Sequence, residues 1–112
     1  MKITGVEARV YRFPTERPEA DGTLQWDATT AVVVLARAGE VTGLGWTYST
    51  AASAAIVRDH LADAATGHST DDVTACYESM HRACRNLGTR GLVMQAISAV
   101  DLALGDLKAR GR

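Results

Sequence analysis

The sequence predicts an α+β domain in which a meander of three antiparallel strands precedes three helices. Two observations lead to this fold class. Apolar residues alternate with polar ones at an interval of two over the first part of the chain, up to about residue 48. From residue 49 onward they recur at intervals of three and four, which is the period of a helix. Strands grouped before helices are typical of α+β domains.

Three segments have the character of strands. Residues 2–13 alternate well enough for a first strand, which Pro14 is expected to end. Residues 28–38 are rich in β-branched side chains and predict a central strand. A tight turn at residues 38–40 leads into a third strand over residues 41–48. The order of these segments suggests an antiparallel meander.

The segment between the first two strands, residues 14–27, is polar and holds both prolines, so we expect a long loop. Trp26 in this loop either contacts a ligand or folds back onto the sheet edge. Arg17 either pairs with a substrate carboxylate or stays solvated. Trp46 and Tyr48 share one face of the third strand. One of the two is therefore expected in the core, while Tyr48 reaches the end of the strand.

Two helices follow the strands. Ser49 or Thr50 can cap the first, which runs through an alanine-rich stretch to about Thr66. The second begins after Thr70, where two aspartates favour the positive end of a helix, and it ends near Gly88. No internal repeat or low-complexity segment interrupts this order, which indicates a single domain over residues 1–112.

The third helix, from about Leu92 to Arg110, is apolar or small on both sides. One side carries a broad aliphatic stripe that should cover the sheet or the other helices. The other side is not plainly polar and holds Met94, Ser98, Leu102, Gly105 and Ala109. A helix of this kind is usually buried between two layers, and this chain supplies one. The pattern therefore predicts a partner surface outside these residues.

Asp101 and Asp106 in this helix invite a catalytic interpretation, since paired carboxylates perform acid/base or metal chemistry. Five residues apart on a helix, however, they lie about 140° from each other, on different faces. Asp106 can instead pair with Arg110 at a spacing of four. We expect Asp101 to accept hydrogen bonds from nearby backbone or from the missing layer. Both aspartates are therefore predicted to be structural.

Composition excludes several function classes. A chain of 112 residues is too short for a (β/α)8 barrel, which needs roughly 250. A net charge of −1 and the lack of a basic stripe argue against nucleic acid, and no apolar run is long enough to span a bilayer. Cys76 and Cys84 lie too far apart on one helix for a disulfide, and their spacing with His81 matches no closed zinc site. We expect buried, reduced thiols in a cytoplasmic protein.

The run from Ala96 to Arg110 resembles a family signature: alanine, two small residues, an aliphatic residue with aspartate, Ala-Leu, Asp-Leu and a basic residue. This signature closes the N-terminal domain in the mandelate racemase/muconate lactonizing enzyme family of the enolase superfamily. The strand pattern and the segment Gly-Leu-Gly-Trp-Thr-Tyr at residues 43–48 are similar to the same domain. Gly105 departs from the family, many members of which have tryptophan there. The resemblance covers essentially the whole chain.

The resemblance implies an N-terminal capping domain over residues 1–112, with the catalytic (β/α)7β barrel outside this chain. In such enzymes the barrel binds Mg2+ through acidic residues, and Lys or His bases remove the proton α to a substrate carboxylate. No catalytic residue or metal ligand is then assigned to this chain. The capping domain contributes specificity through two loops, which match residues 15–26 and 46–49. The candidate substrate-binding residues in these loops are Arg17, Trp26, Thr47 and Tyr48.

Among the reactions of the family, the polar first loop favours dehydration of an acid sugar over chemistry on an apolar substrate. Racemisation or epimerisation, and cycloisomerisation, of a small carboxylate remain alternatives. The parent enzyme is expected to be a homo-oligomer whose barrel is the partner of this domain. A hypothesis from a different class is a free-standing, non-catalytic binding or interaction module that has no barrel.

Overall fold

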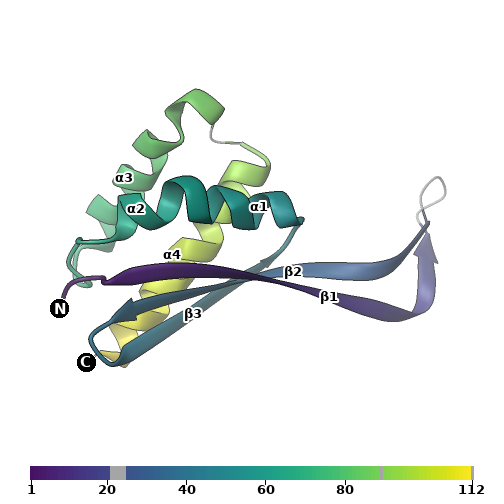
Figure 1. Ribbon diagram of the computed structural model, residues 1–112, viewed down its shortest axis with the longest axis horizontal. Helices are drawn as coiled ribbons and strands as arrows, with labels where there is room; N and C mark the ends of the chain where they lie inside the picture. Colours follow the sequence, from purple (N-terminus) through teal and green to yellow (C-terminus); the bar gives the residue numbers. More distant parts are fainter. Residues whose placement is uncertain (21–24, 89, 112) are drawn as a thin grey trace.

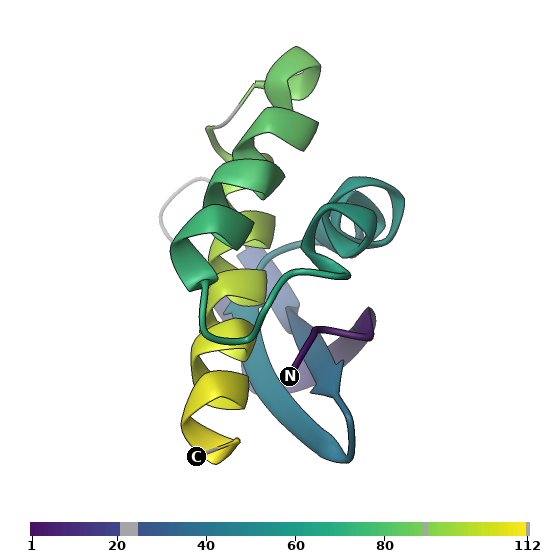
Figure 2. The same cartoon turned by 90° about the vertical axis from the view of Figure 1, so that its left-hand side faces the viewer.

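A three-stranded antiparallel sheet with helices against one of its faces makes up the protein (Figure 1). The computed structural model describes residues 1–20, 25–88 and 90–111. Within these ranges it describes the side chains of all residues except 15–28. The strands lie in chain order, β1-β2-β3. Four helices follow the sheet, and the view in Figure 2 shows all of them on the same side of it. The predicted α+β class and meander are confirmed.

The first two strands are longer than the sequence predicts. β1 covers Gly5–Ala20 and β2 covers Gln25–Ala38, so most of the segment expected as a loop is a β-hairpin. The prediction that Pro14 ends the first strand is wrong, since Pro14 pairs with Ala28. β1 is an edge strand, and an edge strand tolerates proline because one row of its amides needs no partner. The register shifts between Pro14 and Glu19, after which pairing resumes.

The third strand, β3, covers Val41–Tyr48, as predicted. It pairs with β2 from Ala38↔Val41 to Ala31↔Tyr48 without irregularity. Gly39 makes the connecting turn with φ of +58°, a conformation that glycine adopts without strain. β3 is the other edge of the sheet, so it pairs with β2 and not with β1.

The first predicted helix is confirmed, with one interruption. α1 (Ala51–Ile56) and α2 (Ala62–Ala65) are joined by a π-helical turn, Val57–Leu61, so the chain stays helical throughout. Thr50 is the cap, and its hydroxyl oxygen accepts a hydrogen bond from the amide of Ala52 at 3.2 Å. After α2 the chain turns through Gly67, which has φ of +94°.

The remaining helices also follow the prediction closely. α3 (Val73–Ala83) begins one turn later than Thr70, because the carboxylate of Asp72 caps it by accepting from the amide of Ala75. A short 3-10 turn, Arg85–Leu87, follows it. α4 covers Leu92–Arg110 and is the longest helix. Cys76 and Cys84 are free, buried thiols, as expected.

The core lies between the sheet and the helices, and α4 is its centre. The inner face of β2 supplies residues with no exposed surface, and α4 supplies a stripe that is equally enclosed: Val32, Val34, Ala36, Ile97, Val100, Ala103 and Leu107. α4 lies unusually close to β3. A Cβ placed on Gly43 would lie 2.7 Å from the Cα of Leu107, and one on Gly45 would lie 2.5 Å from the amide nitrogen of Ala103. Only glycine permits this approach.

The second side of α4 is open, as predicted. Ser98, Leu102, Gly105 and Ala109 are exposed, and Met94 is half-buried. Leu102 exposes 56% of its surface, although it lies on the helix that is otherwise most deeply enclosed. No described part of the chain forms a layer over this side, which is named the open α4 stripe below.

Candidate functional site

The candidate residues come from two segments at the same end of the sheet. Arg17 lies in β1 and Trp26 in β2. The hairpin that these two strands form extends beyond the helices (Figure 1). Trp26 pairs with Glu19 in this ribbon, so it belongs to a strand and not to a loop as expected. The side chains of both residues lie outside the described part. Their interactions with a substrate therefore stay predictions.

The second segment is the end of β3, where Thr47 and Tyr48 point to opposite faces of the sheet. Tyr48 lies on the outer face, away from the helices, and exposes 61% of its surface. Its ring meets that of Trp46 edge to face, with centroids 5.0 Å apart. Trp46 exposes 49%, so the expectation that one of these two rings is in the core is wrong. Thr47 is half-buried on the helix side.

Ser49 fixes the junction between β3 and α1. Its amide donates to the carbonyl of Thr30 at 3.1 Å, which ties the junction to β2. Its hydroxyl lies 2.6 Å from that of Ser53 and donates to Oε1 of Gln95, also at 2.6 Å. Ser53 is fully buried in α1, and Gln95 is in the first turn of α4. The end of β3 is thus held by three elements at once.

Sequence reasoning considered Ser49 only as a helix cap and missed this network. The cap proved to be Thr50, which leaves the Ser49 hydroxyl available for tertiary hydrogen bonds. The signal that would have found it is weak: two serines at a spacing of four, the first just before a helix. Gln95 gives no local signal, because it is 46 residues away in the chain.

Asp106 has a structural role, as predicted, and a second one that was not foreseen. Its Oδ2 accepts from Nε of Arg110 at 2.8 Å, which is the expected pair at a spacing of four. The same oxygen accepts from the amide of Leu44 at 2.8 Å, so it also ties α4 to the edge of β3. The hydrogen bond from Arg110, followed by that from the amide of Leu44, holds the pKa of Asp106 below its ordinary value.

Asp101 lies in a shallow depression between α3 and α4, with Val73, Thr74 and Tyr77. Burial raises the pKa of its carboxyl. Cys76 is buried nearby. Its burial, and to a smaller extent the negative charge of Asp101, raises the pKa of the thiol to about 11. A thiol with this pKa is protonated at neutral pH and is a poor nucleophile. Asp101 and Asp106 are on different faces, so the two carboxylates do not form a pair.

A metal-binding arrangement is not found among the described residues, since no three His, Cys, Asp or Glu side chains lie close enough to share an ion. Within the same residues, no helix combines the length and apolar character needed to cross a membrane.

Comparison with known proteins agrees with this architecture. Residues 6–112 match the family described as "Mandelate racemase / muconate lactonizing enzyme, N-terminal domain". An L-rhamnonate dehydratase from Saccharopolyspora erythraea is 44% identical over 84 residues, which is 75% of this chain and 21% of that protein.

Two solved structures also superimpose closely. A mandelate racemase/muconate lactonizing enzyme-like protein from Rubrobacter xylanophilus matches with a TM-score of 0.94 at 43% identity, over 98% of this chain and 31% of that one. A racemase from Streptomyces coelicolor, solved with bound magnesium, matches with a TM-score of 0.91 at 32% identity, over 98% and 33%.

This chain therefore spans between a fifth and a third of these relatives. The match extends over the three strands, the helices and the signature in α4. The protein belongs to the mandelate racemase/muconate lactonizing enzyme family and carries the fold of its N-terminal domain.

Proposed function

We propose that this chain is the capping domain of a Mg2+-dependent acid-sugar dehydratase. The whole enzyme would remove the proton α to a carboxylate, and Mg2+ would stabilise the anion that forms. The observation that carries the proposal is the 44% identity to an L-rhamnonate dehydratase across most of this chain. L-rhamnonate is an acid sugar, which agrees with the polar hairpin at the candidate site.

The open α4 stripe supports the proposed place of this chain in a larger enzyme. A helix with Leu102 exposed on one side and Leu107 fully buried on the other is suited to lie between two layers. The sheet is one of them. We propose that a catalytic barrel is the second and that it carries the base and the metal ligands, so that residues 1–112 contribute no catalytic group.

The role proposed for this chain is to select and orient the substrate. Arg17 would pair with a carboxylate, and Trp26 would cover the ligand from the hairpin. Thr47 and Tyr48 would contact it from the end of β3. Because these two side chains leave opposite faces, a ligand that meets both must lie beyond the strand end. The buried thiols are consistent with a reducing compartment, and we propose the cytoplasm.

The test is an assay of the protein encoded by the entire reading frame. We expect conversion of L-rhamnonate, or of a related acid sugar, to the 2-keto-3-deoxy acid, which is lost with EDTA and restored by Mg2+. Arg17→Met should raise KM more than it lowers kcat, whereas Arg12→Met on the same hairpin should change neither. A reading frame that stops after codon 112 would contradict the proposal and favour the free-standing module.

A racemase is the second candidate, because the racemase from Streptomyces coelicolor also superimposes closely on this chain. The same assay separates the two. A dehydratase releases water and forms a keto acid, whereas a racemase or epimerase exchanges the α proton with D2O and keeps every hydroxyl group. Exchange without loss of water would refute the dehydratase. A protein that leaves acid sugars unchanged and instead closes an unsaturated carboxylate to a lactone, without loss or gain of water, would indicate a cycloisomerase.

A further inference from the structure

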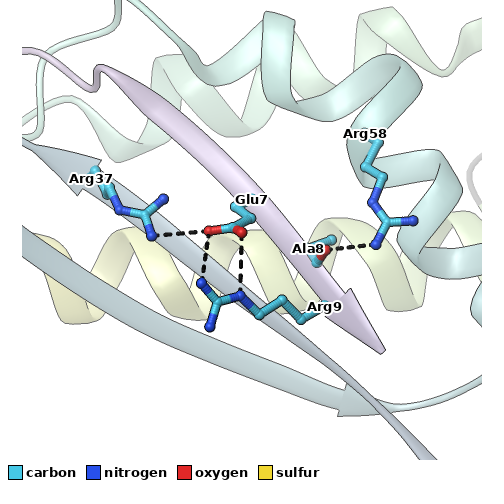
Figure 3. A network of polar contacts seen from close by, with 5 residues as sticks. All are labelled: Glu7, Ala8, Arg9, Arg37 and Arg58. Carbon is cyan, nitrogen blue, oxygen red and sulfur yellow. Dashed lines mark hydrogen bonds and ion pairs between the residues drawn. The ribbon is translucent and has the colours of Figure 1, made fainter. Parts of the chain in front are cut away.

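Asp101 is a partly buried carboxylate that has no cation beside it. Among the residues whose side chains the structure describes, three acidic ones are partly buried, namely Glu7, Asp101 and Asp106, and the others are exposed. Glu7 accepts from Nε of Arg9 at 3.2 Å and from Nη2 of Arg37 at 2.9 Å (Figure 3). Asp106 has its cation one turn along α4. No side chain in the described part forms an ion pair with Asp101.

The depression that holds Asp101 has the size of a site for one side chain. It lies between α3 and α4, which run side by side (Figure 2), and Val73, Thr74 and Tyr77 complete its lining. Its volume is about 320 Å³, at the lower limit of small-molecule pockets. A single long side chain therefore fits it better than a larger ligand does.

The lining of the depression has the chemistry that recognises a cation. The Asp101 carboxylate can accept charge-assisted hydrogen bonds, and the ring of Tyr77 can attract a cation to its face. This ring packs against that of His81, with centroids 4.5 Å apart, so it is held in place before a ligand arrives. A guanidinium suits both groups, because it is planar, stacks on aromatic rings and donates two hydrogen bonds to one carboxylate.

The depression borders the open α4 stripe. Asp101 follows Ser98 by three residues and precedes Gly105 by four, so it is their neighbour on the helix surface. Both belong to the stripe, and a layer over them would also cover the depression. Burial within this chain already raises the pKa of Asp101. A further loss of water without a cation would be strongly destabilising, so the covering layer has to supply one.

We propose that the layer over α4 inserts an arginine side chain into this depression, where its guanidinium pairs with Asp101 and stacks on Tyr77. The inference rests on the proposed function, because it takes the catalytic barrel as that layer, but it is independent of the reaction. This chain spans between a fifth and a third of its relatives, so the arginine can come from the remainder of such a protein. A two-pronged hydrogen bond also fixes direction. Asp101 would thus position the capping domain on the barrel.

Hydrogen exchange in α3 and α4 tests the pair in Asp101→Asn. In the 112-residue chain the substitution should leave exchange unchanged or slow it, because asparagine removes a poorly solvated charge. In the protein encoded by the entire reading frame it should accelerate exchange on the order of tenfold, because the arginine loses its carboxylate. Asp63→Asn, at an exposed position of α2, is the control and should change neither. Equal effects in the two proteins, or no effect in the entire one, would overturn the proposal.

N-Ethylguanidinium carries the head group of arginine and tests the chemistry of the depression directly. Added to the 112-residue chain at constant ionic strength, it should shift the NMR signals of the Thr74, Tyr77 and Asp101 amides in a saturable way. The affinity should fall about tenfold in Asp101→Asn. It should stay unchanged in Asp106→Asn, which removes the same charge from α4 where Arg110 already occupies it. Absence of saturable shifts, or equal binding by Asp101→Asn, would refute the cation site.

The two experiments separate this proposal from the proposed function, because neither requires turnover. An active dehydratase whose entire protein is insensitive to Asp101→Asn would refute the arginine pair alone. A protein that shows both effects without dehydrating an acid sugar would refute the reaction alone. Binding of N-ethylguanidinium to the chain, without an effect of Asp101→Asn in the entire protein, would assign the depression to a free organic cation and would also overturn the pair.

Discussion

The two faces of the sheet differ in what they touch, and the difference is clearest in β3. On the inner face, Gly43 and Gly45 have no side chain, and α4 lies against their backbone. On the outer face, the residues between and beside them are large and exposed, as Leu44 and Trp46 show. One strand therefore carries a face that is specialised for close packing within the chain and a face whose apolar side chains stay exposed.

Gly45→Ala should disrupt the packing of α4 on the inner face of β3 and cause the largest loss of stability. The new Cβ would lie 2.5 Å from the amide nitrogen of Ala103, and backbone on both sides prevents it from moving away. We expect a loss of about 3 kcal/mol or more in the free energy of unfolding, the upper end of overpacking costs, measured by urea denaturation.

Gly105→Ala is the control for that substitution, since no atom lies within 4 Å of its added Cβ. Alanine in the middle of α4 should instead stabilise the chain by up to about 1 kcal/mol through helix propensity. If the two variants were equally stable, the close approach of α4 to β3 would be disproved.

A matched pair of valines on β2 should sharpen the comparison with a smaller effect. Val34 is fully buried on the inner face, whereas Val33 is half-buried on the outer face. Threonine has the shape of valine, so Val34→Thr mainly buries a hydroxyl, at a cost of about 1–3 kcal/mol. Val33→Thr should change the stability of the monomer by no more than about 0.5 kcal/mol. Equal losses at low protein concentration would mean that both faces are enclosed.

The parts of the fold that could be predicted from the sequence are those that depend on residues close together in the chain. The bounds of β3 and α4, the Thr50 cap and the pair between Asp106 and Arg110 depend on neighbours within a few residues, so local patterns were sufficient. The hairpin was missed because prolines and polar residues usually indicate a loop. Its strands are instead held by pairing between β1 and β2, and an edge position makes proline acceptable.

The candidate site was less predictable, because its geometry comes from residues far apart in the chain. That Thr47 and Tyr48 point to opposite faces follows from strand alternation, but which face the helices cover depends on the packing of the whole chain, so Trp46 and Tyr48 are both exposed. The hydrogen bond from Leu44 to Asp106 joins residues 62 apart. The alternation of Gly43 and Gly45 was the one available signal of close packing, since two glycines on one face of a strand mark a close approach.

Asp106→Asn should have the smallest effect, and the effect should depend on pH. The folded pKa of Asp106 lies below its unfolded value, because the carboxylate accepts from Arg110 and from the amide of Leu44. Its contribution to stability is therefore complete above the unfolded pKa and is lost as the pH falls through the folded one. Because the side chain of Asp106 stays partly exposed to solvent, we expect a modest loss at neutral pH, smaller than that of Val34→Thr.

Urea denaturation of wild type and Asp106→Asn at a series of pH values measures this difference. The two stability curves should be apart at neutral pH and converge on the acid side of the ordinary range of an aspartate. Asp63→Asn, at an exposed position of α2, should follow wild type throughout. Curves for Asp106→Asn that stay parallel to wild type down to low pH would show that the ionised carboxylate does not hold α4 against β3. The position of α4 against β3 would then depend on packing, including the close approach at Gly43 and Gly45.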